Sequence, residues 1–251
     1  ARVSFVSDSD WRKWGQIDPY FGVGSFDEFK VDRIDENRTR FFDTGRREVE
    51  IALDDIASRY DDVARRRALD FGSGVGRLAL PLAEHYEEVV GVDISEAMIA
   101  EARENCADAG VANARFVLSD DGLTRVTGSF DLVHSYIVLQ HIPVERGLAL
   151  TARMLSRLAP GGVACLHYSL QRTLPPAREF VYALKHRAPF GRLVMNLLQR
   201  RAWDAPAMQM NNYPLARILR LYAQHGLEDV FVAPEWQETA LTARIYGRKR
   251  A

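Results

Sequence analysis

The chain has 251 residues, of which 47% are hydrophobic and 27% charged, as in a soluble globular protein large enough for one α/β domain with an added lid. Its formal charge of −1 gives no electrostatic reason to expect a nucleic acid or an anionic membrane as partner. The two cysteines lack metal-ligand spacing, no apolar run approaches the ~20 residues of a membrane span, and residues 1–10 lack a secretion signal. We therefore expect a cytoplasmic protein.

Short apolar runs alternate with helical patterns along most of the chain. Strands are predicted at 68–71, 89–92, 115–118, 130–136 and 163–168, and helices at about 44–63, 75–85, 95–109 and 144–158. A helix at 214–225 and strands at 227–233 and 241–246 follow. This order predicts right-handed βαβ units and a parallel sheet, and the continuous apolar strands predict that both faces are covered.

The pattern divides the chain into four parts. Residues 1–43 form an aromatic N-terminal arm or lid, 44–169 a ligand-binding core, 170–213 a helical insertion, and 214–251 the C-terminal part of the core sheet. The insertion is too long for a simple connection, and we expect it to be a substrate lid. Residues 172–203 contain seven Lys or Arg and one Glu, so the amphipathic stretch 185–203 could instead contact a membrane peripherally or meet a phosphorylated or lipid-linked substrate.

The clearest motif is a glycine turn between a buried strand and a helix. Gly72, Gly74 and Gly76 follow the strand in the spacing G-x-G-x-G, which permits positive φ and leaves the backbone open to a ligand. A dinucleotide site has the spacing G-x-G-x-x-G instead. Asp70, at the strand end, would sit badly beside a pyrophosphate but suits the ammonium group of a methionine moiety.

Two further strands end in acidic residues. Asp93 lies roughly 20 residues beyond the first glycine, the separation at which a carboxylate reaches ribose hydroxyls. Asp120 or Asp121, after the third strand, can accept a hydrogen bond from an adenine amino group. The competing interpretation is that Asp121 caps the turn before Gly122.

These motifs together resemble the class I S-adenosylmethionine-dependent methyltransferase family, small-molecule branch, as do the segments 130–142 and 158–162. The resemblance is close over 60–170 and rests on pattern alone over 214–248. It implies a doubly wound, Rossmann-like, mostly parallel seven-stranded sheet with the last strand antiparallel. It also implies S-adenosyl-L-methionine as cofactor and S-adenosyl-L-homocysteine as product.

The family pattern distributes the cofactor contacts over this chain. It implies the three glycines at the methionine part, Asp93 and Ile94 at the ribose, and Asp120 or Asp121 at the adenine with Met98 packed against it. It places Ser135 and Gln140 on the methionine side. Tyr20 or Phe21 of the arm is expected to close the pocket; the alternative is that these aromatics belong to the core or to a dimer contact.

Candidate bases lie after the fourth strand and at the end of the fifth. His141 and His167 are our candidates for activating a hydroxyl acceptor, with Tyr168 beside them. Each histidine also has a structural interpretation, and His134 is expected to serve packing only. An amine or carboxylate acceptor would need no base. We predict no metal, because the acids that can be placed are used by the cofactor.

We thus predict methyl transfer to a small-molecule acceptor, favouring a hydroxyl of a sugar, lipid-linked or secondary-metabolite type. N-methylation and protein methylation are alternatives within the same class. A nicotinamide-dependent Rossmann oxidoreductase is disfavoured by the glycine spacing, and a non-catalytic binding module by the intact motifs. The sequence contains no aromatic and basic stripe for single-stranded nucleic acid. It does not predict an oligomeric state.

Overall fold

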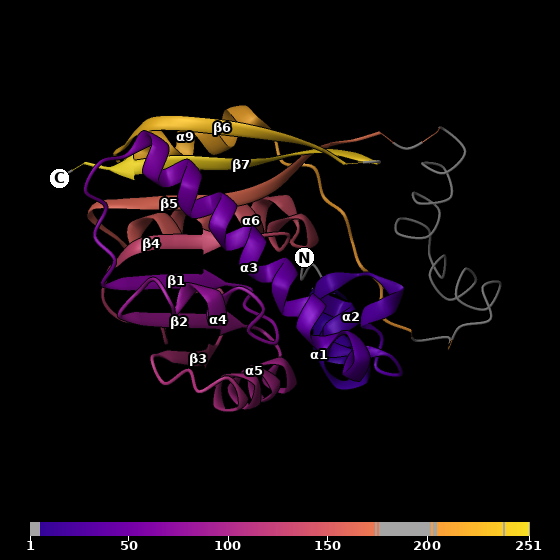
Figure 1. The fold of residues 1–251 in the computed structure, drawn as a ribbon. Helices are drawn as coiled ribbons and strands as arrows, with labels where there is room; N and C mark the ends of the chain where they lie inside the picture. Colours follow the sequence, from indigo (N-terminus) through magenta and orange to yellow (C-terminus); the bar gives the residue numbers. More distant parts are fainter. Residues whose placement is uncertain (1–5, 174, 176–201, 203–204, 238, 251) are drawn as a thin grey trace.

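The computed structural model describes residues 6–173, 175, 202, 205–237 and 239–250. One seven-stranded sheet, in the order β3-β2-β1-β4-β5-β7-β6, forms its centre (Figure 1). Its strands are β1 (Arg67–Phe71), β2 (Glu88–Asp93), β3 (Ala114–Leu118), β4 (Phe130–Ser135), β5 (Leu158–Arg172), β6 (Leu227–Gln237) and β7 (Ala240–Lys249).

The pairing within the sheet matches the predicted topology. Strands β1 to β5 pair in parallel, and β7 pairs antiparallel with both β5 and β6. The mostly parallel, doubly wound sheet with an antiparallel last strand is therefore confirmed. All carboxyl ends of the parallel strands lie at one edge, where ligands bind in open α/β sheets.

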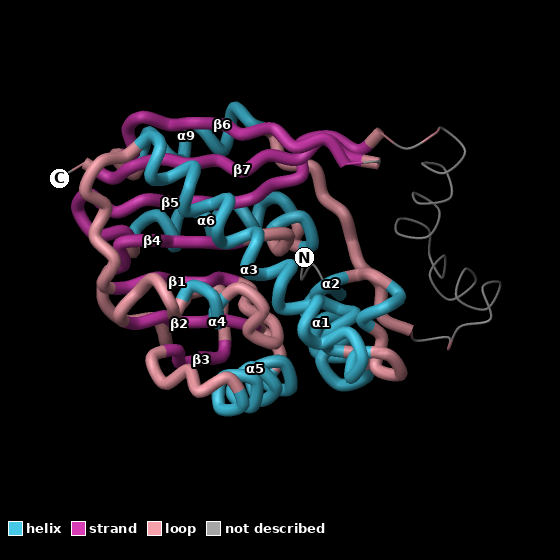
Figure 2. The backbone as a smooth tube through the Cα atoms, in the orientation of Figure 1, coloured by secondary structure: helices cyan, strands magenta, loops and turns pink. Residues whose placement is uncertain are grey.

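Helices cover both faces of the sheet (Figures 1 and 2). On one face lie α3 (Ile34–Arg59), α4 (Ala79–Leu82) and α5 (Glu96–Asp108), with one apolar cluster beneath them that includes residues of β1, β2, β4, β5 and β7. On the other face, α6 (Val144–Ser156) and α9 (Leu215–Gln224) enclose a second cluster. Burial on both faces explains why the strands are continuously apolar rather than alternating.

Helix α3 begins ten residues before the predicted start at residue 44 and ends before the predicted end at 63. Ile34 and Phe41 continue its buried stripe toward the N-terminus, although charged residues between them obscure the period in the sequence. The helix ends at Arg59, and the chain then turns through Asp62, whose φ is +52°. Figure 1 shows α3 crossing the sheet diagonally and reaching the carboxyl edge.

Two other elements differ in extent from the prediction. The helix predicted over 75–85 is reduced to α4, in which Pro81 supplies no N–H for the helical ladder. Strand β5 is longer than predicted because Leu158 already pairs with Phe130, before a register shift that leads into the pairing of Val163 with Leu132.

The N-terminal arm packs at the carboxyl edge of the sheet (Figure 1). It contains α1 (Val6–Ile17), α2 (Pro19–Gly24) and the short 3-10 helix η1 (Asp27–Phe29). Its aromatic residues form a third apolar cluster, which includes Val75 of the glycine turn and Met98 of α5. The arm is therefore part of the same packed body as the sheet.

The insertion predicted over 170–213 is described only in part. Strand β5 accounts for its beginning, and residues 205–213 run along the carboxyl edge. The helical stretch predicted near 190–201 lies outside the described residues, as does most of the amphipathic stretch 185–203. Among the described helices, none is long and apolar enough to cross a membrane.

Candidate active site

The glycine turn adopts the left-handed conformation that the sequence predicts. Gly72, Gly74 and Gly76 have φ values of +78°, +52° and +87°. A Cβ at Gly72 would lie 2.3 Å from a Val138 methyl group, and one at Gly74 would lie 2.5 Å from Val23 Cγ2. Glycine is therefore required both by the backbone and by the two valines that pack over the turn.

Asp93, at the end of β2, joins this turn to the start of α5. Its Oδ2 accepts a hydrogen bond from the Gly74 N–H, and its Oδ1 accepts one from the Ser95 N–H, both at 2.9 Å. Ser95 Oγ in turn accepts from the Met98 N–H at 3.4 Å, so Ser95 is the N-cap of α5. Burial raises the pKa of Asp93 to about 6 despite these donors.

Asp70 forms a buried pair with His134 of β4. Asp70 Oδ1 lies 3.3 Å from His134 Nδ1, whereas Asp70 Oδ2 has no hydrogen-bond partner. Burial opposes protonation of His134, but its hydrogen bonds to Asp70 and Cys165 outweigh it and raise its pKa to about 9. His134 is thus buried within the sheet, as expected, and is in addition paired with Asp70. The free Oδ2 fits an ammonium group of the kind a methionine moiety carries.

Both acids that follow β3 have partners within the protein. Asp120 Oδ1 accepts from the Gly122 N–H at 2.8 Å and the Thr124 N–H at 3.1 Å, so Asp120 has the turn-capping role that was considered for its neighbour. Asp121 Oδ1 lies 2.7 Å from Arg146 Nε. A contact of either acid with an adenine stays a prediction.

The residues predicted beside the methionine part lie at the carboxyl end of β4. Ser135 Oγ donates to the Phe71 carbonyl at 2.9 Å and so ties β4 to β1. The Gln140 carbonyl accepts from the Asn211 N–H at 2.7 Å, and its side-chain Oε1 is buried without a partner. Ile94, predicted at the ribose, is partly buried next to the end of β2.

His141 is buried between the arm and the strap formed by residues 205–213. Its Nδ1 lies 2.6 Å from the Gln209 carbonyl and therefore carries the proton, which leaves Nε2 3.3 Å from the Gln140 Nε2 amide. The Trp11 ring is 4.9 Å from the imidazole, measured between centroids. Burial lowers the pKa of His141 to about 4, so the ring is neutral.

His167 and Tyr168 point to opposite faces of β5. Tyr168 is fully buried on the α6 and α9 side, and its hydroxyl bonds to Thr151 Oγ1 at 3.0 Å. The catalytic role predicted for Tyr168 is therefore corrected to a structural one. His167 lies under α3, where its Nδ1 accepts from the Ile137 N–H at 3.3 Å. Burial lowers the pKa of His167 to about 3.

Tyr20 of the arm is buried in the apolar cluster that includes Val75 of the glycine turn. Its hydroxyl donates to Glu101 Oε1 at 2.5 Å and lies 2.9 Å from Asn105 Oδ1, both on α5. Its ring packs edge-on against Phe41, with 5.1 Å between centroids. The arm residue that covers the turn is instead Val23.

A buried ionic cluster under α3 was not predicted from the sequence. Arg244 of β7 is ion-paired with Glu48 of α3 and lies 2.6 Å from Glu235 of β6. Its guanidinium also lies over the Tyr136 ring, 4.8 Å from the centroid. The one signal in the sequence is a charged residue in the middle of an otherwise apolar strand.

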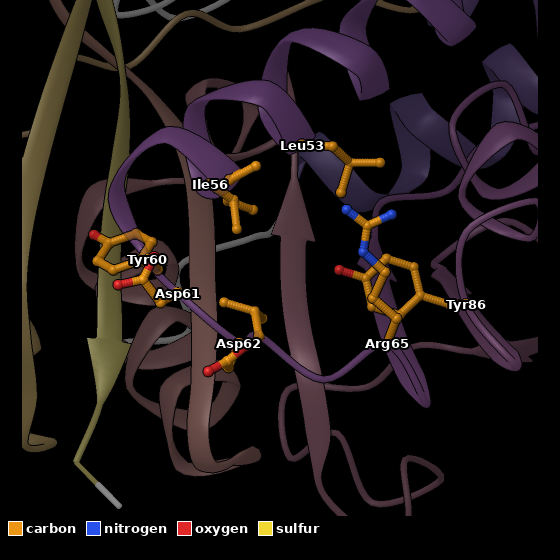
Figure 3. A pocket seen from close by; sticks show the side chains of 9 residues that line it. Leu53, Ile56, Tyr60, Asp61, Asp62, Arg65 and Tyr86 are labelled. Atoms are coloured by element: carbon orange, nitrogen blue, oxygen red, sulfur yellow. The ribbon is translucent and has the colours of Figure 1, made fainter.

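The hollow shown in Figure 3 lies away from these residues. It has a volume of about 270 Å³ and is lined by the end of α3 and by the segment that leads into β1, including Tyr60, Asp62 and Arg65. That segment enters the amino end of β1, opposite the glycine turn. Among the described residues, no group of three or more His, Cys, Asp or Glu side chains is arranged to hold a metal ion.

Comparison with known proteins agrees with this geometry. Residues 68–162 match a family described as a methyltransferase domain. Over 98% of this chain and 95% of the other, the fold resembles the crystal structure of the Synechocystis magnesium protoporphyrin IX methyltransferase with bound S-adenosylhomocysteine. The TM-score is 0.59 at 17% identity, which establishes the fold alone. The chain belongs to the class I S-adenosylmethionine-dependent methyltransferases, and S-adenosylmethionine is the cofactor of this family.

Relatives with curated names cover several substrates. The chain is 34% identical over 181 residues to a trans-aconitate 2-methyltransferase of Variovorax paradoxus, matching 68% of this chain and 66% of the relative. It is 31% identical to a ubiquinone biosynthesis O-methyltransferase of Methylococcus capsulatus, over 41% of this chain and 43% of the relative. It is 40% identical to a 23S rRNA (uracil-C5) methyltransferase of Aeromonas hydrophila, over 35% of this chain but only 20% of the relative. The chain thus spans less than half of the length of the last two relatives.

Proposed function

We propose that this chain transfers the methyl group of S-adenosylmethionine to an oxygen of a small-molecule acceptor. The observation that carries the proposal is the left-handed glycine turn, tied to the start of α5 by the partly exposed Asp93 carboxylate. When bound, the cofactor supplies an activated methyl group and leaves as S-adenosylhomocysteine. The family assignment replaces the alternative of a nicotinamide-dependent oxidoreductase.

The described residues fit this cofactor in two respects. Asp70 Oδ2 is a buried acceptor without a partner beside the first glycine, as an ammonium group requires. The Asp93 carboxylate is only partly covered, although both its oxygens accept backbone hydrogen bonds, so it keeps acceptor capacity for a ribose hydroxyl. We propose these two acids as the main polar contacts.

We propose that the acceptor binds next to the end of β4, between the arm and the strap of residues 205–213. Trp11 of the arm contacts His141, and the strap bonds to both Gln140 and His141 through Asn211 and Gln209. These contacts would exclude water from the reacting atoms, which is the main requirement of an in-line methyl transfer. They also support the interpretation of 170–213 as a substrate lid.

The two histidines bear on which kind of oxygen accepts the methyl group. His141 directs its free lone pair at an amide N–H, and the Nδ1 lone pair of His167 is occupied by Ile137. Neither imidazole is therefore placed to remove a proton from a substrate. A carboxylate acceptor is ionised at neutral pH and needs no base, so we propose it as a second candidate beside an acidic hydroxyl. The relative named for trans-aconitate supports this choice.

Two parts of the acceptor prediction have less support. A phosphorylated or lipid-linked acceptor rested on the basic stretch 185–203, which lies almost entirely outside the described residues. A nucleic-acid acceptor is disfavoured by the charge balance of the chain, and the rRNA-modifying relative matches over only 20% of its own length.

The test is transfer of radioactive methyl from labelled S-adenosylmethionine. The purified chain would be incubated with trans-aconitate, with a catechol and with a simple sugar in separate reactions. Base-labile label on the carboxylate identifies a methyl ester, and base-stable label on the catechol identifies a methyl ether. Label on none of these acceptors, or on an added amine or protein instead, would contradict an oxygen acceptor of these classes.

A further inference from the structure

A strained residue lies two positions beyond Ser135, the last residue of β4. Ile137 has a φ of +54°, and a β-branched side chain in this left-handed region is a genuine outlier. Such strain persists only where the surrounding structure holds it, and it gathers at functional sites. Here it turns the chain at the point where β4 reaches the glycine turn.

The backbone N–H of Ile137 has a side-chain partner, the His167 imidazole. The Ile137 N–H donates to His167 Nδ1 at 3.3 Å, and the imidazole is 1% exposed on the neighbouring strand β5. The ring is fixed in turn by Tyr136, whose ring centroid lies 4.7 Å away. Ile137 is half-buried, and without this acceptor its N–H would lose its partner within the protein, which gives the chain a reason to leave the left-handed region.

The turn at Ile137 sets the position of the next residue. Val138 packs directly on Gly72, so closely that a Cβ on the glycine would lie 2.3 Å from a valine methyl group. Residues 139–141 then form the 3-10 helix η2, which carries Gln140 and His141. The conformation of Ile137 therefore determines how this segment meets the glycine turn.

We propose that His167 is a positioning residue, which holds Ile137 in the left-handed conformation through Nδ1 and thereby shapes the cofactor side of the site. This role replaces that of a general base. Because Nδ1 accepts a hydrogen bond, Nε2 carries the proton, and its nearest carboxylate oxygen, on Glu235, is 3.8 Å away. A ring with this tautomer has no free lone pair for a substrate proton.

Two isosteric substitutions separate the two roles. In His167→Asn the amide oxygen can take the place of Nδ1, whereas in His167→Gln the amide group reaches the place of Nε2. Calorimetric titration with S-adenosylhomocysteine should give nearly wild-type affinity for the Asn variant and about a tenfold or greater loss for the Gln variant. Equal losses in both variants would overturn the proposal.

A second-site substitution tests the strain itself. Glycine adopts a positive φ without penalty, so Ile137→Gly in the His167→Gln background should recover most of the lost affinity. Urea unfolding of each variant shows whether it is folded under the conditions of the titration. If the double variant binds no better than His167→Gln alone, the left-handed residue is not what His167 supports.

The inference rests on the proposed cofactor site, and the wild-type titration separates the two. If the wild-type chain does not bind S-adenosylhomocysteine, the proposed function fails. If the wild-type chain binds but His167→Asn does not bind more tightly than His167→Gln, only the role proposed for His167 fails. If His167 were instead a general base, His167→Asn would keep its affinity for S-adenosylhomocysteine but would turn over more slowly.

Discussion

Replacing Gly74 by alanine tests the contact between the arm and the glycine turn. The new Cβ would lie 2.5 Å from Val23 Cγ2, about 1 Å closer than carbon atoms normally approach. Forcing such a contact costs roughly 1–3 kcal/mol. The φ of +52° adds about 1–2 kcal/mol for any L-residue other than glycine. The free energy of unfolding should therefore fall by roughly 2–5 kcal/mol.

Two further variants divide this cost into its parts. Gly110→Ala has a similar φ, +68°, with nothing within 4 Å of the new Cβ, so it should show the backbone cost alone. Val23→Ala removes the contacting methyl groups, so in the Gly74→Ala background it should recover the steric part but not the backbone part. The assay is urea unfolding followed by tryptophan fluorescence. If Val23→Ala does not reduce the cost of Gly74→Ala, the arm does not pack on the turn as described.

Three further predictions concern single side chains. The pKa of His134 is raised to about 9 from its usual value near 6.5, so its protonation stabilises the native state, fully so below pH ~6.5. This stabilisation, at most about 3 kcal/mol, should be lost as the pH rises toward 9. The free energy of urea unfolding of His134→Gln should lack this pH dependence. Tyr168→Phe should cost about 1 kcal/mol of stability and leave turnover unchanged, so a large fall in turnover without unfolding would restore its catalytic role. Because burial raises the pKa of Asp93 to about 6, the affinity for S-adenosylhomocysteine should weaken as the pH falls through 6. Asp93→Asn should abolish this pH dependence. An unchanged pH profile in this variant would show that Asp93 is not the group whose protonation weakens binding.

The sequence predicted the sheet well because local signals determine it. Continuous apolar runs between helical patterns permit few arrangements other than a parallel, doubly wound sheet. The left-handed glycines were predictable for the same reason, since their spacing has a direct conformational meaning. The start of α3 was not, because charged residues between Ile34 and Phe41 mask the helical period.

The site was predicted less completely because long-range pairing decides it. Nothing local indicates that Asp70 of β1 meets His134 of the adjacent strand β4, or that Arg244 lies between Glu48 and Glu235. The two histidines were chosen as bases because His141 follows the fourth predicted strand and His167 lies at the end of the fifth. Which lone pair each imidazole keeps free depends on neighbours distant in sequence, such as Gln209 for His141.

Binding of the cofactor through Asp93 can be measured by calorimetric titration with S-adenosylhomocysteine, using the wild-type chain, Asp93→Ala, and Asp54→Ala as an exposed control on α3. The proposed cofactor site predicts micromolar binding to the wild type and to the control, and a loss of about 1–3 kcal/mol of binding free energy, roughly 5- to 150-fold in affinity, in folded Asp93→Ala. Absence of binding to the folded wild-type chain, or unchanged affinity in Asp93→Ala, would contradict it.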